Sequence, residues 1–174
     1  FDKILAERAH CLLVIVPRHP ERSLSVKELC NRRNLKVLCK TDNMECDEST
    51  QVFILDTLGE LPMYYAASDV AFVGGSFTKV GGHNMLEPVS LGLPVIMGPH
   101  VFNFQEISQL LLDEGVAWKV FCADELFSRV SGLLGDANLR HSTGERGRNI
   151  VLKNRGKVEN VMKLLRDFFR TSVT

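Results

Sequence analysis

Short apolar runs alternate with helix-like stretches along the 174 residues, and this alternation constrains the fold more than any other feature. The runs cover residues 11–16, 36–39, 52–55, 69–73, 94–97 and 116–120. Helix-like stretches cover residues 21–34, 58–67, 83–91, 104–114, 124–134 and much of 138–169. Strands that are apolar on both faces and separated by helices are typical of a parallel sheet covered on two sides. We therefore expect an α/β chain with a Rossmann-like, three-layer parallel sheet and helices on both faces.

Charge and cysteine content exclude several other classes of protein. Lys plus Arg and Asp plus Glu are balanced at 21 each, so the chain lacks the basic signature of a nucleic-acid partner. No apolar run reaches the ~18 residues that a membrane-spanning helix needs. The five cysteines include no CxxC pair, and the five histidines form no HExxH motif. We therefore expect no metal site and no cofactor.

The C-terminal region is locally basic. Residues 140–174 contain nine Lys or Arg and three Asp or Glu. Such a stretch is either a solvated helix face or a surface for phosphates, an anionic membrane or a partner domain. The sequence leaves these alternatives open.

In parallel α/β sheets, ligands bind outside the carboxyl ends of the strands, so the loops that follow the strands are the candidates for function. The first, residues 17–22 (PRHPER), brings Arg18 to a strand end, and guanidinium groups recognise phosphate or carboxylate in a bidentate manner. A loop with surface ion pairs is the structural alternative.

The second loop, residues 56–61, combines Thr57 with Glu60 in a capping-box pattern. Its backbone is also suited to reading the edge of a base.

The third loop, residues 74–88 (GGSFTKVGGHNMLEP), is the most informative. Two glycine pairs follow a buried strand directly, and glycine permits close backbone approach and positive φ. We expect a helix to begin near His83, so that its N-terminus forms an anion site with Asn84 and Glu87 on one face. The pattern is neither GxGxxG nor a P-loop. Tight helix–sheet packing is the structural alternative.

The fourth loop, residues 98–106, follows the run at 94–97. Asn103 is placed to cap the next helix. Alternatively, the loop has a binding role, in which the side chain of His100 or Gln105 faces a donor sugar.

Together these loops resemble one protein family. The segments VPRHPER, ILDTLGELPMYYAASDVAFVGGSF and GGHNMLEPVSLGLPVIMGPHVFNFQEI resemble the C-terminal half of bacterial 3-deoxy-D-manno-octulosonic acid (Kdo) transferases. The resemblance is strong over residues 14–107 and weaker beyond. It implies a GT-B glycosyltransferase, in which residues 1–174 are the nucleotide-sugar (donor) binding domain. The N-terminal acceptor domain is then expected to be absent from the chain.

The resemblance also implies the roles of individual residues. Arg18 matches a phosphate-facing arginine that stabilises the leaving group, and Glu87 matches an acidic residue placed to hold the ribose. A cytosine-facing turn matches Gly59, Glu60 and Leu61. The phosphate cradle matches Ser76, Gly81, Gly82, His83 and Asn84. Lys79 lies in the same loop, but no motif assigns it a role.

The implied reaction is an inverting, metal-independent transfer of Kdo from CMP-Kdo to a lipid A precursor in lipopolysaccharide biosynthesis. The general base is expected on the missing domain, so this chain alone should bind CMP weakly and transfer nothing. The full-length enzyme is expected at the cytoplasmic face of the bacterial inner membrane, with this part soluble. The alternatives are the donor domain of another GT-B enzyme, such as a UDP-sugar transferase or an epimerase, and a non-catalytic nucleotide-binding module.

Overall fold

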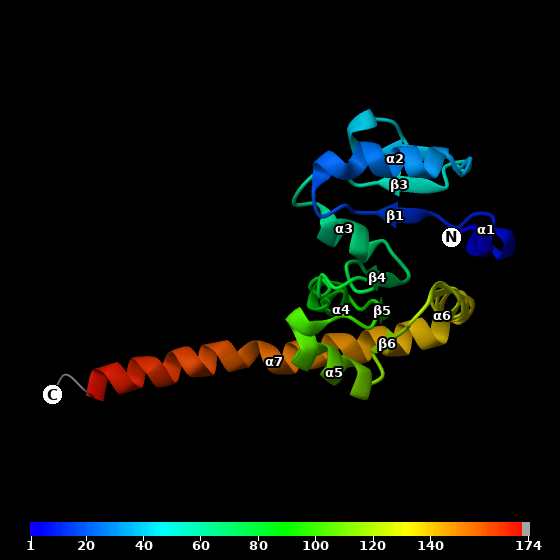
Figure 1. The fold of residues 1–174 in the computed structure, drawn as a ribbon. Coiled ribbons are helices and arrows are strands. Elements are labelled where there is room, and N and C mark those ends of the chain that lie inside the picture. Colours follow the sequence, from blue (N-terminus) through cyan, green and yellow to red (C-terminus); the bar gives the residue numbers. More distant parts are fainter. Residues whose placement is uncertain (172–174) are drawn as a thin grey trace.

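The computed structural model describes the backbone of residues 1–171 and the side chains of residues 1–154. Every apolar run expected to form a strand contains one (Figure 1). The strands are β1 (Leu13–Ile15), β2 (Val37–Cys39), β3 (Val52–Ile54), β4 (Ala71–Val73), β5 (Val95–Met97) and β6 (Ala117–Lys119). The strands are shorter than the runs, and β4 and β5 end at the last residue of their runs, directly before Gly74 and Gly98.

All strand pairs are parallel, and within the described residues they form two three-stranded sheets instead of one continuous sheet. The strand orders are β1-β3-β2 and β4-β5-β6. In the first sheet Val14 lies opposite Phe53, and in the second Ile96 lies opposite Trp118. The predicted α/β class with a covered parallel sheet is confirmed. The difference is that hydrogen bonding divides the sheet into two halves.

The helices are α1 (Asp2–Glu7), α2 (Ser23–Asn31), α3 (Leu61–Ala66), α4 (Leu86–Ser90), α5 (Gln105–Asp113), α6 (Ala123–Gly135) and α7 (Ala137–Thr171). Single 3-10 turns are η1 (Pro20–Arg22), η2 (Lys40–Asp42) and η3 (Phe102–Phe104). Helix α1 was not expected from the sequence. It joins the two halves: Asp2 Oδ2 accepts a hydrogen bond from Arg33 of the first half at 3.0 Å, whereas Lys3 Nζ lies 2.5 Å from Asp124 Oδ1 on α6 and the Ser131 hydroxyl of α6 donates to Glu7. No helix among the described residues has the length and apolar content to cross a bilayer.

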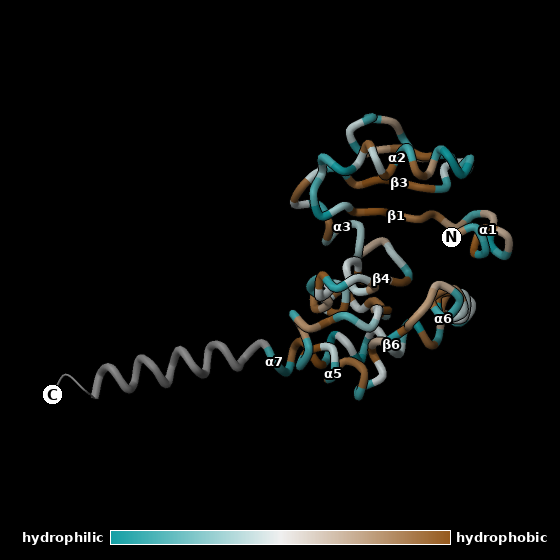
Figure 2. The backbone as a smooth tube through the Cα atoms, in the orientation of Figure 1, coloured by the Kyte–Doolittle hydropathy of each residue, from teal (hydrophilic) through white to brown (hydrophobic). Residues whose placement is uncertain are grey.

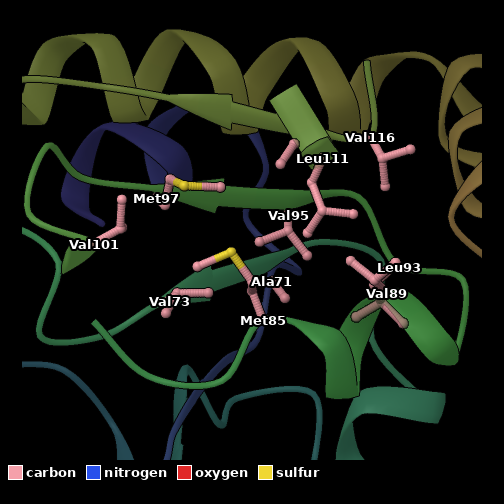
Figure 3. Close-up of a cluster of buried hydrophobic side chains, with 11 residues drawn as sticks. Ala71, Val73, Met85, Val89, Leu93, Val95, Met97, Val101, Leu111 and Val116 are labelled. Atoms are coloured by element: carbon pink, nitrogen blue, oxygen red, sulfur yellow. The ribbon is translucent and has the colours of Figure 1, made fainter. Parts of the chain in front are cut away.

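Both faces of each half-sheet are covered, since alternate strand residues point to opposite faces. In β5, Val95 and Met97 pack with Met85 and Leu111 on one face (Figure 3). Ile96 packs with Leu133 of α6 on the other face. In β3, Val52 and Ile54 pack under α2, and the Phe53 ring stacks on Tyr64 of α3 with ring centres 5.5 Å apart. The apolar strands at the centre of each half are visible in Figure 2. The three-layer arrangement predicted from the sequence is therefore present in each half.

The described part of the basic C-terminal stretch is used for internal contacts. Arg140 donates to the carbonyl oxygens of Leu133 and Leu134 and lies 3.2 Å from Asp69 Oδ1. Arg146 donates to Gly115 O. Arginines near helix ends satisfy carbonyl groups that the helix leaves unpaired. Basic side chains beyond residue 154 lie outside the described set.

Candidate functional site

Ser76 joins the loops that follow β4 and β5. Its side chain is fully buried. The hydroxyl donates to Val73 O at 2.5 Å and accepts the N–H of Gly98 at 2.8 Å. A backbone hydrogen bond also joins the two loops, since the N–H of His100 donates to Ser76 O at 2.9 Å. The Ser76 hydroxyl is thus engaged in holding two strand ends together.

Gly81 lies where the same two loops meet a second time. Its φ is +98°, and a Cβ there would lie 2.5 Å from Asn103 Nδ2 and 2.6 Å from Phe102 Cε2. Asn103 Nδ2 in turn donates to Val80 O at 3.1 Å. The prediction that Asn103 caps the next helix is wrong, since α5 begins after Phe104 without a side-chain cap. Instead the Asn103 amide fastens the glycine loop.

The side chain of His83 lies beside the first glycine pair, Gly74 and Gly75. Its imidazole lies against Gly74 and Gly75, where a Cβ would approach His83 Cδ2 to 3.8 Å and His83 Nε2 to 3.4 Å, respectively. The φ of Gly75 is also positive, at +71°. Both distances are ordinary van der Waals contacts, so the ring does not exclude a side chain, and only the backbone conformation of Gly75 favours glycine.

The second glycine pair leaves backbone donors available. Gly81 and Gly82 both have positive φ, and the N–H of Gly82 donates to Gly75 O. The N–H groups of Gly81, His83 and Asn84 donate to no carbonyl or side chain among the described residues. Consecutive backbone N–H groups around positive-φ residues form concave sites for anions.

The expected helix start at His83 is wrong. Helix α4 begins at Leu86 and has five residues. Asn84 Oδ1 accepts the N–H of Leu86 at 3.0 Å, so the side chain of Asn84 closes the turn before the helix. Any anion at His83 would therefore meet the loop's N–H groups and not the end of a helix.

Glu87 lies in the first turn of α4 and is exposed. Its Oε1 accepts a hydrogen bond from Asn84 Nδ2 at 3.0 Å. The two side chains are therefore neighbours, but the expectation that both lie on one helical face is wrong, because Asn84 precedes the first residue of α4. Sequence reasoning missed a neighbour, Tyr65 on α3. Burial raises the pKa of the Tyr65 phenol, and the negative charge of Glu87 adds to that effect. Residues 22 positions apart give no local pattern, so only the packing of α3 on α4 reveals this proximity.

The loop after β3 is open at its tip. Gly59 has φ of +87°, and no atom lies within 4 Å of the position of a Cβ. Glu60 accepts the Thr57 hydroxyl at 3.3 Å and lies 3.8 Å from Lys40 Nζ. The predicted capping box is wrong, because α3 begins at Leu61, one turn later than that pattern requires. A further pair missed from the sequence, Thr41 and Asp56, joins the ends of β2 and β3 through a 2.6 Å hydrogen bond.

Arg18 lies in the loop after β1, is exposed, and makes no ion pair or hydrogen bond within residues 1–154. Lys79, in the glycine loop, is also exposed. No hydrogen bond or ion pair among the described residues joins the side chain of Arg18 to the glycine loop. The two loops share only the carboxyl-end position on their respective half-sheets, which is the position that the sequence predicted.

The part of the chain that the structure describes contains no group of three His, Cys, Asp or Glu residues arranged to hold a metal ion. A shallow cavity lies at the opposite, amino ends of β1 and β3, away from the candidate loops. It is lined by His10, Leu12, Cys46, Asp47, Glu48 and Thr50.

Comparison with known proteins gives consistent similarities. No protein-family model matches the chain. The chain is 39% identical over 171 residues to a 3-deoxy-D-manno-octulosonic acid transferase of Haemophilus influenzae, covering 98% of this chain and 40% of that protein. It is 33% identical to the Bordetella pertussis transferase, covering 90% and 37%. It thus spans about 40% of the length of these relatives.

A solved structure is similar over most of the fold. The crystal structure of the C-terminal CMP-Kdo binding domain of WaaA from Acinetobacter baumannii superposes with a TM-score of 0.81 at 33% identity, covering 86% of this chain and 78% of that one. Parallel half-sheets with helices on both sides and glycine-rich loops at their carboxyl ends define a Rossmann-like domain of the GT-B glycosyltransferase class. The chain belongs to the family of 3-deoxy-D-manno-octulosonic acid transferases. The resemblance stated from the loop motifs is confirmed.

Proposed function

We propose that this chain is the donor-binding domain of a glycosyltransferase that transfers Kdo from CMP-Kdo to a lipid A precursor. The observation that carries the proposal is the 0.81 TM-score, at 33% identity, to a domain described as CMP-Kdo binding. The N–H groups of Gly81, His83 and Asn84, which donate to no group among the described residues, support it, because such groups suit the phosphate of this donor.

Each part of CMP has a proposed partner. The phosphate is held by the N–H groups of Gly81, His83 and Asn84 and by the guanidinium of Arg18. The ribose hydroxyls donate to Glu87, which Asn84 holds in place. The cytosine edge meets the backbone of residues 59–61, where the open tip at Gly59 admits a ligand. Ser76 and Gly82 contribute by keeping the loop in this shape.

The proposed reaction is an inverting displacement without a metal ion. An acceptor hydroxyl attacks the anomeric carbon of Kdo, the bond from that carbon to the phosphate oxygen breaks, and CMP leaves with the bonding electron pair. Preorganised donors stabilise the negative charge that develops on the leaving phosphate, and removing one typically costs about 10²-fold in rate. The hydroxyl proton goes to a carboxylate base, which we place on an acceptor domain of a longer protein.

The location of the reaction follows from its substrates. A lipid acceptor lies in a membrane, and we place the full-length enzyme at the cytoplasmic face of the inner membrane. This chain alone should bind CMP and transfer no Kdo, and detecting transfer by residues 1–174 would contradict that assignment of the base.

Titration with CMP, UMP, GMP and cytidine, followed by amide NMR shifts, tests the donor site. We expect CMP-selective shifts at residues 59–61 and 81–87. Equal responses to UMP would point to another GT-B donor. No response to any nucleotide, from this chain or from the full-length protein, would overturn the proposal.

A further inference from the structure

The C-terminal end of α4 closes in a tight turn. Gly92 has φ of +82°, its N–H donates to Val89 O at 2.9 Å, and the N–H of Leu93 donates to Pro88 O at 3.0 Å. These two bonds are those of a Schellman motif, which ends a helix on a left-handed glycine. The carbonyl of Leu91 accepts a hydrogen bond from Arg148 Nη2 of α7 at 2.8 Å.

The Arg148 guanidinium also covers the backbone of this turn. A Cβ at Gly92 would lie 2.6 Å from both Cζ and Nε of Arg148. Glycine is therefore favoured at position 92 by its φ, and a Cβ there would displace the flexible guanidinium of Arg148. One side chain of α7 thus fixes the last turn of α4.

Two glycines of α7 bring the helices into backbone contact. Gly144 and Gly147 are buried. A Cβ at Gly144 would overlap the carbonyl oxygen of Gly92, and one at Gly147 would lie 3.0 Å from Val89 Cγ1. Side chains at these positions would push α7 away from α4. The contact between α7 and α4 therefore depends on Gly144, Gly147 and the neighbouring Arg148.

Helix α4 is too short for its structure and orientation to be stable without packing against other elements. Its five residues form less than two turns, and helices of this length gain their stability from packing. The Asn84–Leu86 hydrogen bond fixes its first turn and α7 fixes its last. Glu87 moves with the helix, so its position depends on both ends.

We infer that Arg148 is a positioning residue for nucleotide binding: through the Leu91 carbonyl it sets α4 so that Glu87 and Asn84 meet the ribose. The inference rests on the proposed function of Glu87. Arg148 lies on α7 and touches no part of the predicted donor loops directly, so its effect on binding is indirect.

Arg146 provides a matched control. Like Arg148 it is an arginine of α7 that donates through Nη2 to one backbone carbonyl, that of Gly115, at 3.2 Å. Gly115 follows α5 and not α4. Arg146→Met should therefore remove a similar contact without moving Glu87.

The test compares CMP with 2′,3′-dideoxycytidine monophosphate, which lacks the ribose hydroxyls. We expect Arg148→Met to weaken CMP binding about fivefold, as partial loss of a hydrogen bond to a charged group does. Binding of the dideoxy nucleotide should not change. Arg148→Lys, which retains a charged donor group, should recover part of the loss, and Arg146→Met should leave CMP affinity unchanged. Equal loss for both nucleotides, or equal effects of the two Met variants, would overturn the inference.

A measurement without nucleotide separates this inference from the proposed function. The side-chain amide resonances of Asn84 report the Asn84–Glu87 hydrogen bond in the free protein. They should shift in Arg148→Met and not in Arg146→Met. If wild type fails to bind CMP, the proposed function fails. If the Asn84 resonances do not respond, the positioning role of Arg148 fails irrespective of binding.

Discussion

The side chains of Asn84 and Glu87 are joined by a hydrogen bond at the start of α4. Asn84 Nδ2 donates to Glu87 Oε1 at 3.0 Å, and Asn84 Oδ1 accepts the N–H of Leu86 at the same distance. A single amide therefore closes the turn and orients the carboxylate. Preorganisation of this kind lowers the entropy cost of binding.

Replacing Glu87 tests the ribose contact. We expect Glu87→Ala to weaken CMP binding about tenfold, since hydrogen bonds to charged groups contribute more than neutral ones. Calorimetric titration with CMP measures the change. Glu114→Ala is the control, because Glu114 is an exposed carboxylate at the far end of α5. Equal affinities for wild type and Glu87→Ala would remove Glu87 from the site.

Replacing Arg18 tests the phosphate contact. Arg18 is exposed and unpaired among the described residues, so Arg18→Gln should leave the melting temperature unchanged. The affinity for CMP should fall about tenfold, and that for cytidine, which has no phosphate, should not. Arg32→Gln, at the end of α2, is the matched control. A parallel loss of cytidine binding would contradict the phosphate assignment.

Replacing Ser76 tests the strut between β4 and β5. Ser76→Ala removes the acceptor of the buried Gly98 N–H, and we expect a loss of about 1–3 kcal/mol in the free energy of unfolding. Urea denaturation measures it. Ser142→Ala, whose hydroxyl donates only to the preceding turn of its own helix, should change stability by less than about 0.5 kcal/mol. Unchanged stability with weakened CMP binding would instead make Ser76 a direct phosphate ligand.

Two glycine replacements separate backbone strain from crowding. Both Gly59 and Gly81 have positive φ, so alanine is strained at either, by roughly 1–2 kcal/mol. Only at Gly81 would the new methyl group also collide, with Phe102 and Asn103. We expect Gly81→Ala to lower the melting temperature further than Gly59→Ala. The reverse order in a thermal melt would contradict the loop geometry.

Asp42 links stability to pH. Its Oδ2 accepts the N–H of Cys39 at 2.8 Å and lies 2.9 Å from Lys27 Nζ, and these contacts lower the pKa of Asp42. A carboxyl with a lowered folded-state pKa stabilises the protein above its unfolded-state pKa of about 4, and loses that contribution as pH falls through the folded-state value. Asp42→Asn should therefore be less stable than wild type at pH 7.

The stabilities of wild type and Asp42→Asn should approach each other as pH falls below about 4, and converge below the folded-state pKa of Asp42. The pKa of Lys27 is raised mainly by its hydrogen bond with Asp42, so the lysine contribution is present at neutral pH and disappears only at strongly alkaline pH. Denaturation curves between pH 2 and pH 7 measure the convergence. A constant difference across that range would mean that Asp42 does not titrate in this window.

Prediction from the sequence was accurate where one local cause dominates. The strand positions followed from buried apolar runs. The proximity of Asn84 and Glu87 was also predicted, although it comes from the turn before α4 and not from helical spacing. Prediction failed where several local solutions compete. Thr57, Asn103 and a helix start at His83 all satisfy capping rules, but the side chains of Thr57 and Asn103 bond elsewhere and α4 begins at Leu86.

The sequence by itself determined the α/β class, the placement of candidate residues after strands, and the family, since alternating apolar runs and a long loop motif are local in the chain. Tertiary structure alone decided which loops are tied together and what holds α4. Ser76 reaches Gly98 and Arg148 reaches Leu91 across 22 and 57 positions, respectively. Such contacts depend on how elements pack, because hydrogen-bond partners distant in sequence carry no periodicity that a local pattern could reveal.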